Sequence, residues 1–196
     1  RTDAINAAVS DSGNIAAILA SQLSRSLHAI DTVLLEVRKS KRDMRIESAP
    51  TFRAAYNKKA VHESLAQAMA GLPQIFNIAI ADENGQLVVS TAAWPTPDIN
   101  ISDRDYFQNA RTRRDDRLSA SVPINNRING AQTIVFARRL ESASGAFMGI
   151  VYASVNTDYF ENIYGSIQSV RDLMFTLVRQ DGIILFRYPD PGNSAG

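Results

Sequence analysis

The chain has 196 residues, 45% of them hydrophobic, with 21 basic and 20 acidic side chains, two histidines and no cysteine. A chain of this length can bury the core of one ordinary domain, or of one domain and part of a second. The lack of cysteine excludes disulfide scaffolds, thiol nucleophiles and thiolate-bound zinc, and a net charge of +1 gives no general attraction to nucleic acid. His28 and His62 are the only imidazoles, so a two-histidine metal site or a Ser-His-Asp triad has thin support.

No segment is apolar enough to cross a bilayer. The most apolar stretch, Phe147 to Val155, has about nine residues, whereas a spanning helix needs about 20. The chain begins Arg1-Thr2-Asp3, with neither a signal peptide nor an initiator methionine, so we expect it to be a fragment of a longer protein. A cysteine-free chain suits the periplasm and the cytoplasm equally well.

The first part of the sequence predicts one long helix over residues 2 to 45, about 65 Å in length. It contains one glycine, Gly13, and no proline. A heptad-like apolar stripe runs through Leu23, Leu27, Ile30, Leu34, Val37 and Met44. Such a helix needs a partner, which is either its own domain or a second copy along its N-terminal half, and both remain open. The basic run 38–42 has acidic neighbours and is interpreted as a solvated helix end.

The rest of the chain alternates short helices with β-rich runs. We expect helices at residues 59–70, 104–113 and 158–167. The expected strands are residues 75–81, 86–90, 118–124, 133–140, 147–155, 173–179 and 183–188. The first two form a hairpin, because Asn84-Gly85 between them suits a turn with positive φ. The pattern predicts an α+β fold with five antiparallel strands and helices on one face, followed by the first hairpin of a second unit.

Several stretches, in the same order along the chain, resemble a known family. They are residues 23–34, the Ile-Ser-Asp-Arg-Asp-Tyr-Phe run at 101–107, and residues 136–140, 145–153, 158–160 and 177–185. Each stretch alone is common, but their succession resembles the extracytoplasmic double Cache (PAS-like) sensor domains of bacterial transmembrane receptors. The resemblance implies a PAS-like module with a five-stranded antiparallel sheet.

The resemblance also implies how the chain is divided and what surrounds it. Residues 1–48 would be the N-terminal signalling and dimerisation helix, 49–168 the membrane-distal Cache module and 169–196 the incomplete start of the membrane-proximal module. The chain would be the periplasmic part of an inner-membrane protein with flanking membrane helices. Its partners would be a small-molecule ligand and a second copy bound through the N-terminal helix, without nucleic acid.

A Cache pocket lies between the sheet of the distal module and the loops and short helix above it. The resemblance and the residue chemistry together nominate Trp94, Arg104, Tyr106, Phe107, Ser119, Ser121, Arg138, Tyr152 and Ser154 as ligand-binding residues. They offer aromatic walls, hydroxyls and guanidinium groups that hold a carboxylate or phosphate through two hydrogen bonds. Strand alternation puts Tyr152 and Ser154 on one face.

Alternative roles stay open for most of these side chains. Tyr106 and Phe107 could anchor their helix to the core, and Trp94 could be either a lid or packing. Arg104 could pair with a neighbouring aspartate, Asp103 or Asp105. Of the adjacent Arg138 and Arg139, we expect one to face water.

One departure from the family narrows the ligand class. The amino-acid-binding branch holds the ligand carboxylate with an Arg-x-Trp-Tyr stretch and its ammonium with a strand aspartate. Here the stretch reads Arg104-Asp105-Tyr106-Phe107, and the strand position is Ser154. An ammonium would lack its counter-charge in a closed pocket. We therefore expect a small carboxylate, another anion or a neutral molecule, and not a typical amino acid.

The leading functional hypothesis is periplasmic ligand sensing, relayed through the long helix to a cytoplasmic output domain. A diguanylate cyclase (GGDEF) is the first expectation for that domain. The alternatives are a histidine kinase, a chemoreceptor, or a dimerisation module without a ligand. We expect no catalytic residues in this chain, because Asp103 with Asp105 and Asp115 with Asp116 are not accompanied by a nucleophile and base. We also expect neither a metal nor a cofactor.

Overall fold

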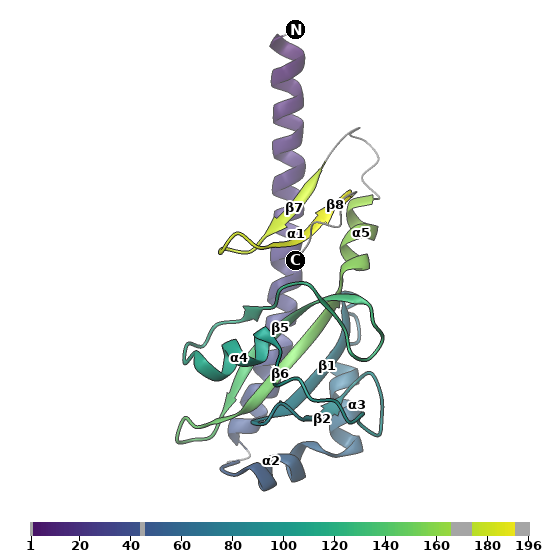
Figure 1. Cartoon of the computed structure of the whole chain (residues 1–196). Helices are drawn as coiled ribbons and strands as arrows, with labels where there is room; N and C mark the ends of the chain where they lie inside the picture. The colour runs from purple at the N-terminus through teal and green to yellow at the C-terminus, as the bar shows by residue number, and fades with distance from the viewer. Residues whose placement is uncertain (1, 44–45, 166–173, 191–196) are drawn as a thin grey trace.

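The computed structural model describes residues 2–43, 46–165 and 174–190, and its longest element is the N-terminal helix α1 (Thr2–Asp43) (Figure 1). The C-terminal half of α1 lies along an antiparallel sheet, and the N-terminal half extends beyond it. The predicted long helix is confirmed as far as Asp43, and Met44 lies outside the described residues. No helix among the described residues is both long enough and apolar enough to span a bilayer.

The helix α2 (Ala49–Tyr56), which contains Pro50, was not among the predicted helices. Proline suits the first turn of a helix, where its missing N–H would be unpaired in any case. Ser48 caps α2: its hydroxyl accepts from the Thr51 N–H, and the Thr51 hydroxyl accepts from the Ser48 N–H. The predicted helix that follows is confirmed as α3 (Lys59–Ala68).

The sheet runs in the order β2-β1-β6-β5-β3, with β4 paired to the same outer edge of β5 as β3. Its strands are β1 (Ile75–Asp82), β2 (Leu87–Ser90), β3 (Ser119–Ala120), β4 (Ile124–Asn125), β5 (Gln132–Glu141) and β6 (Phe147–Asn156). Every pairing is antiparallel. Because β3 and β4 occupy successive parts of one edge, the sheet has the five positions that the sequence predicts.

The single strand predicted at residues 118–124 is in fact two short strands. Ser121 continues the pairing, since its N–H donates to the Val135 carbonyl at 2.8 Å and its hydroxyl accepts from the Val135 N–H at 2.9 Å. Pro123 follows at once and has no N–H to donate to a sheet. The chain leaves the edge of β5 there and rejoins it at Ile124.

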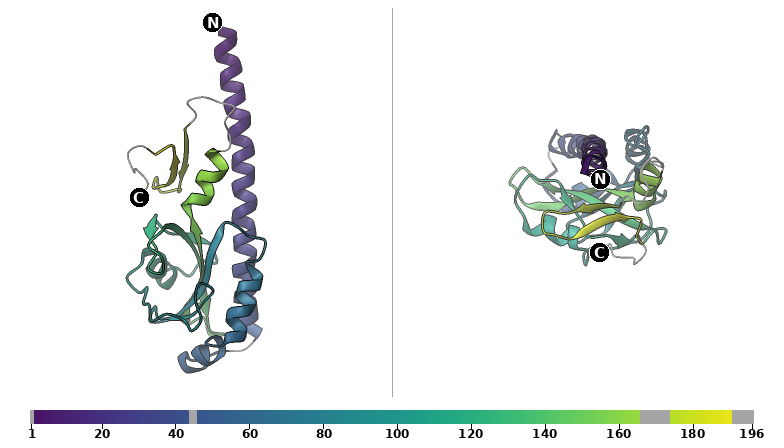
Figure 2. Two further views of the ribbon diagram at one scale, coloured as in Figure 1. Left: turned by 90° about the vertical axis from the view of Figure 1, so that its right-hand side faces the viewer. Right: turned by 90° about the horizontal axis from the view of Figure 1, so that it is seen from above.

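The two faces of the sheet carry different layers (Figure 2). The helical layer of α1 and α3 covers one face, over a core that includes Ile30, Leu34, Ile78, Ile134, Val151 and Val155. The helix α4 (Asp105–Thr112) covers the other face, over a core that includes Ala79, Tyr106, Phe107, Val135, Ile150 and Tyr152. The expectation that all helices share one face is therefore wrong for α4.

The last described elements are the helix α5 (Thr157–Gly165) and a separate hairpin, β7 (Phe175–Val178) and β8 (Ile184–Tyr188). The hairpin packs on α5 through aromatic rings, with the Phe160 and Phe186 centroids 5.5 Å apart. Arg179 also donates to the Ala120 carbonyl of β3 at 2.7 Å. The expected strand start at residue 173 and helix end at 166–167 lie outside the described residues.

Candidate functional site

A small cavity lies on the face of the sheet that carries α4. It is lined by Leu87, Ile99, Ile101, Arg104, Tyr106, Ile124, Asn126, Arg127, Ile128, Val135, Tyr152 and Ser154. Its volume is about 20 Å³ in this conformation, close to that of a single water-sized sphere. Any larger ligand requires the loops above the sheet to move.

The floor of the cavity comes from two paired strands. Ser154 of β6 lies directly across from Val135 of β5, so their side chains share a face. Ser154 is only 1% exposed, and its hydroxyl has no hydrogen-bond partner among the described residues. A buried unpaired hydroxyl destabilises a fold by about 1–3 kcal/mol. Such a group at the floor of a cavity is a natural contact for a bound ligand.

The wall of the cavity comes from the start of α4. Tyr106 lies in its first turn, and its ring centroid is 5.6 Å from that of Tyr152. Burial raises the pKa of both phenols, so both remain neutral hydrogen-bonding groups at neutral pH. Arg104 directly precedes the helix, and its Nη2 donates to the Asn125 carbonyl at 3.2 Å.

The neighbours of Arg104 are engaged elsewhere. Asp103 forms a two-bond ion pair with Arg127, at 2.9 and 2.6 Å, and this hydrogen bonding lowers the pKa of the Asp103 carboxyl. Asp105 Oδ2 accepts from the Val122 N–H at 3.0 Å, which fastens the start of α4 to the loop after β3. The alternative that Arg104 pairs with either aspartate is therefore not observed. Within the described ranges, none of the ion pairs involves Arg104.

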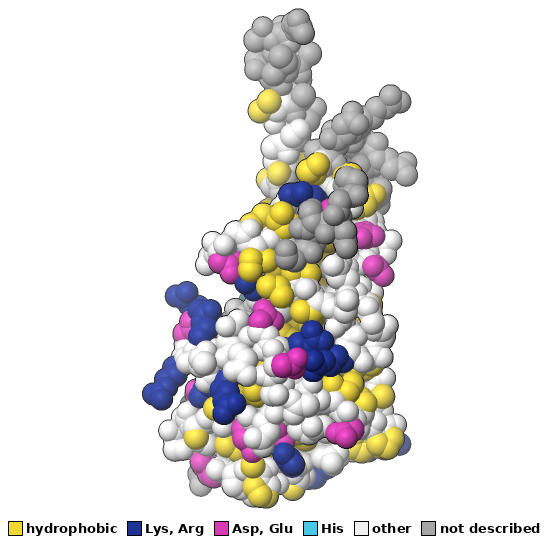
Figure 3. All heavy atoms as spheres, viewed as in Figure 1, with side chains coloured by type: hydrophobic (Ala, Val, Ile, Leu, Met, Phe, Trp, Pro, Cys, Tyr) yellow, Lys and Arg dark blue, Asp and Glu magenta, His cyan; other side chains and the backbone are white. Residues whose placement is uncertain are grey.

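Arg127 is a lining residue that the sequence did not nominate. It comes from the loop between β4 and β5, and its Nη1 also donates a short hydrogen bond to the Asn100 carbonyl. Its partners lie far away in sequence, and no local pattern distinguishes it from other surface arginines. Among the residues that the structure describes, the lining thus has two guanidinium groups and no carboxylate. Basic and acidic side chains lie next to one another on this face of the molecule (Figure 3).

Three nominated residues lie near the cavity without lining it. Phe107 is fully buried on α4, and its ring meets that of Phe147 at 5.6 Å, so it anchors the helix. The Ser119 hydroxyl donates to the Ala137 carbonyl at 3.1 Å, and the Ser121 hydroxyl is bonded within the strand edge. Both hydroxyls therefore form hydrogen bonds with the backbone of the sheet.

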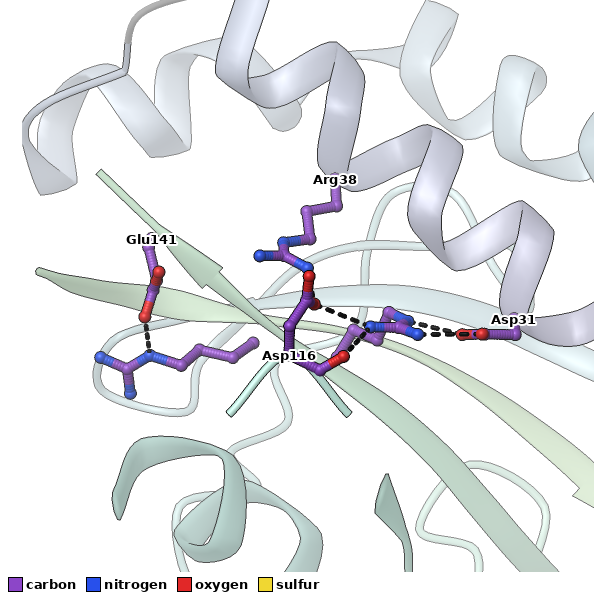
Figure 4. Close-up of polar contacts among 6 residues, drawn as sticks. Asp31, Arg38, Asp116 and Glu141 are labelled. Carbon is purple, nitrogen blue, oxygen red and sulfur yellow. Dashed lines mark hydrogen bonds and ion pairs between the residues drawn. The ribbon is translucent and has the colours of Figure 1, made fainter. Parts of the chain in front are cut away.

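Two nominated residues lie on the opposite side of the sheet, toward the helices. Trp94 packs near α3, with its ring centroid 5.9 Å from that of His62. Arg138 lies across from Val151 and therefore points away from the face of Tyr152. It binds Asp31 of α1 (Figure 4). Neither Arg138 nor Arg139 faces water, since their side chains are 8% and 11% exposed, so that expectation is wrong.

A second, larger groove of about 360 Å³ lies between α1 and α3. Its lining is mostly aliphatic, and Glu36 is the one charged side chain among the lining residues described. Among the described residues it offers no cation for an anionic ligand, and its other polar side chains are Ser40, Tyr56 and Ser64. The chemistry of the smaller cavity, with its arginines, phenols and unpaired hydroxyl, makes it the better candidate site.

The model of the Cache domain family matches residues 1–193. The extracellular domain named for the histidine kinase rpHK1S-Z16 superposes with a TM-score of 0.72 at 28% identity, over 90% of this chain and 68% of that one. The ligand-binding domain of the chemoreceptor PctC of Pseudomonas aeruginosa PAO1, in complex with GABA, has a TM-score of 0.58 at 17% identity, over 88% of this chain and 71% of its own.

The ligand-binding domain of the Pseudomonas fluorescens chemoreceptor CtaA, in complex with L-valine, has a TM-score of 0.61 at 17% identity, over 88% of this chain and 68% of its own. At 17% identity, the likeness to the two chemoreceptor domains shows a shared fold alone. No curated protein matches the sequence. The family match spans nearly the whole chain, and the α+β fold agrees with it. The chain therefore belongs to the Cache domain family, as a double Cache domain of the extracellular ligand-sensing type.

Proposed function

We propose that the chain is the periplasmic sensor of an inner-membrane receptor, and that its cavity under α4 binds a small anionic or neutral molecule other than a typical amino acid. The observation that carries this proposal is the lining itself, whose described residues combine two guanidinium groups with an unpaired serine hydroxyl and include no carboxylate. The Cache domain is a non-catalytic sensor. Any enzymatic activity would belong to a separate output domain.

Arg104 supports an anionic ligand most directly. Its guanidinium is next to the cavity, and its one described hydrogen bond goes to a neutral carbonyl. A guanidinium fork binds a carboxylate or phosphate through two parallel hydrogen bonds. Arg127 is already neutralised by Asp103, so it adds less positive charge to the site. The ligand anion would therefore lie against Arg104, with its other end toward Ser154.

The same lining disfavours an α-amino acid. The ammonium group of such a ligand would be buried without a carboxylate beside it, which costs several kcal/mol in a closed site. The structures of the chemoreceptor domains of similar fold are complexes with GABA and L-valine, which carry an ammonium group. Ser154, at the position where the amino-acid-binding branch has an aspartate, is the residue that we propose separates this chain from that branch.

Signal relay would begin with a movement of α4 and the adjacent loops. The cavity is too small for a ligand of several atoms, so binding must select a conformation in which these segments stand further from the sheet. We propose that residues 49–168 form the sensing module, that 169–196 begin a membrane-proximal module, and that α1 (within residues 1–48) leads to a flanking membrane helix.

The output domain is proposed by analogy. The similarity to the extracellular domain named for a histidine kinase, at 28% identity, supports a kinase output more directly than the diguanylate cyclase first expected. A chemoreceptor output remains the further alternative, with support from the fold alone.

A homodimer through the N-terminal half of α1 is also part of the proposal. The C-terminal half of the helix packs on its own sheet through Ile30, Val33 and Leu34. In the N-terminal half, Val9 and Ile18 are 67% and 64% exposed. Apolar side chains on an extended helix favour pairing with a second copy. Sedimentation of the chain with Ile18→Asp tests this, and an unchanged mass would contradict it.

Calorimetric titration tests the ligand class. Small carboxylates and inorganic phosphate are titrated into the chain, with the common L-amino acids as a second panel. We expect binding from the first panel only, and we expect Arg104→Ala to weaken it about 10-fold or more, as for a lost charge-assisted hydrogen bond. Arg114→Ala, on an exposed loop, is the matched control. Micromolar binding of common L-amino acids would overturn the proposal.

A further inference from the structure

We propose that Asp116, held between Arg38 of α1 and Arg138 of β5, couples movements of α4 to the position of α1. The inference rests on the sensing function proposed above and names the device that would carry its signal. The contacts come from three elements that are far apart in the sequence and lie together on the α1 side of the sheet (Figure 4).

The geometry of the network is specific. Arg138 binds Asp31 of α1 through two parallel hydrogen bonds, from Nε at 2.5 Å and from Nη2 at 2.9 Å. Its Nη1 donates to both the carbonyl and the Oδ1 of Asp116, each at 2.9 Å. The same Oδ1 accepts a short hydrogen bond from Arg38 Nη1. Asp116, which belongs to neither element, therefore contacts both β5 and α1.

This network adds directionality to a contact that is otherwise apolar. Leu34 and its apolar neighbours hold α1 on the sheet, and the hydrophobic effect that drives their burial is non-directional. Ion pairs with fixed hydrogen-bond angles are directional. Asp31 and Arg38 lie about two turns apart on one face of α1. Their contacts with Arg138 and Asp116 define where α1 lies along β5.

Asp116 is also connected to the candidate site. It lies in the loop that directly follows α4, and the first turn of α4 places Tyr106 in the cavity. At the other end of α4, Arg139 Nη1 donates to the carbonyls of Ala110 and Arg111, at 2.9 and 2.7 Å. A displacement of α4 on ligand binding would therefore move the loop that carries Asp116.

The members of the network differ in how easily they separate. Arg138 is 7% exposed, so its charge requires a carboxylate partner in every conformation, and Asp31 supplies one from α1 itself. The Asp116 side chain is 65% exposed and can return to water at little cost. Asp116 is thus the releasable contact. Its departure would leave Arg138 paired with Asp31 while removing one hydrogen-bond partner from Arg38.

Amide hydrogen exchange tests this coupling without a ligand. One perturbation is made at each end: Arg104→Ala at the cavity and Arg38→Met on α1. Because coupling is reciprocal, Arg104→Ala should increase exchange in α1 around residues 31–38, and Arg38→Met should increase exchange in α4, each about fivefold or more. In an Asp116→Asn background both distant effects should disappear. Asp115→Asn, which removes only the Arg113 ion pair, should leave them intact.

Two further variants separate coupling from general loosening. Leu27→Ala weakens the packing of α1 without touching the network and should leave exchange in α4 unchanged. Arg38→Lys keeps the charge and should retain most of the coupling. If Arg38→Met leaves α4 exchange at the wild-type rate, or if the effects persist with Asp116→Asn, the proposal is overturned. Because no ligand is used, either result is independent of the calorimetric test of the binding site.

Discussion

Arg138 and Arg139 are consecutive residues of β5, and their side chains leave opposite faces of the sheet to hold two different helices. Arg138 binds the Asp31 carboxylate of α1 with two hydrogen bonds (Figure 4). Arg139 donates to the last carbonyls of α4 at Ala110 and Arg111. Two consecutive residues of one strand therefore hold both the helix that covers the cavity and the helix that we propose carries the signal.

Arg139→Met should loosen the end of α4. It removes two charge-assisted hydrogen bonds to helix carbonyls and the ion pair with Glu141, while the methionine keeps much of the packing on Phe147. We expect the free energy of unfolding to fall by about 1–3 kcal/mol. Urea denaturation measures the loss, and Arg113→Met, which removes an exposed ion pair, should change it by less than about 0.5 kcal/mol.

Gly85→Ala should disturb the loop that precedes α4. Gly85 has φ of 80°, and an added Cβ would lie 2.5 Å from the Ser102 nitrogen. The positive φ and the close contact with Ser102 together should lower the free energy of unfolding by about 2–4 kcal/mol. Gly71→Ala is the matched control, because φ there is 84° but nothing lies within 4 Å of the added atom, so it should cost about 1 kcal/mol. Equal losses in the two variants would show that Ser102 does not pack on the turn.

Leu34→Ala should destabilise the contact between α1 and the sheet. Leu34 is fully buried in the core on the helical face, and its truncation should lower the free energy of unfolding by about 2–5 kcal/mol. The adjacent Leu35 is partly exposed. Leu35→Ala should cost less than about 1 kcal/mol by the same urea measurement, and a reversed order would mean that α1 is rotated from the position described.

Alkaline titration should report on the closed cavity. Burial raises the pKa of Tyr106 and Tyr152 above the ordinary value of 10.0. Below that value both phenols are protonated in the folded and the unfolded chain, so their contribution to stability is complete. Above it the unfolded chain loses protons first, and the free energy of unfolding falls as the pH rises.

Ultraviolet difference spectra follow this ionisation, with the urea-unfolded chain as the reference for ordinary tyrosines. Tyr106→Phe and Tyr152→Phe should each remove one late-titrating phenol from the folded protein. If both phenols ionise at the same pH as the tyrosines of the unfolded chain, the cavity is open to solvent.

The sequence predicted the elements whose signals are local. The apolar stripe of α1, and the Asn84-Gly85 turn, depend on residues close together in the chain, and both were confirmed. The helix α2 was missed although Ser48 and Pro50 are a recognisable helix start. The break at Pro123 was also readable in principle, because proline cannot donate to a sheet.

The site was predictable only in part. Alternation within one strand correctly grouped Tyr152 with Ser154, and Arg104 and Tyr106 joined them through the start of α4. Arg138 was nominated for the site but lies on the opposite face, because its orientation relative to Tyr152 depends on which residue of β6 lies opposite it, and neither strand alone determines that register. Arg127 was missed because its pairing with Asp103 is a long-range contact.

The most direct test of the account is a crystal structure of the chain with the tightest-binding compound of the calorimetric panel. We predict that compound between α4 and the sheet, with its anionic group on Arg104 and its far end within hydrogen-bonding distance of the Ser154 hydroxyl. Occupation of the groove between α1 and α3, with the cavity under α4 unchanged, would contradict the account.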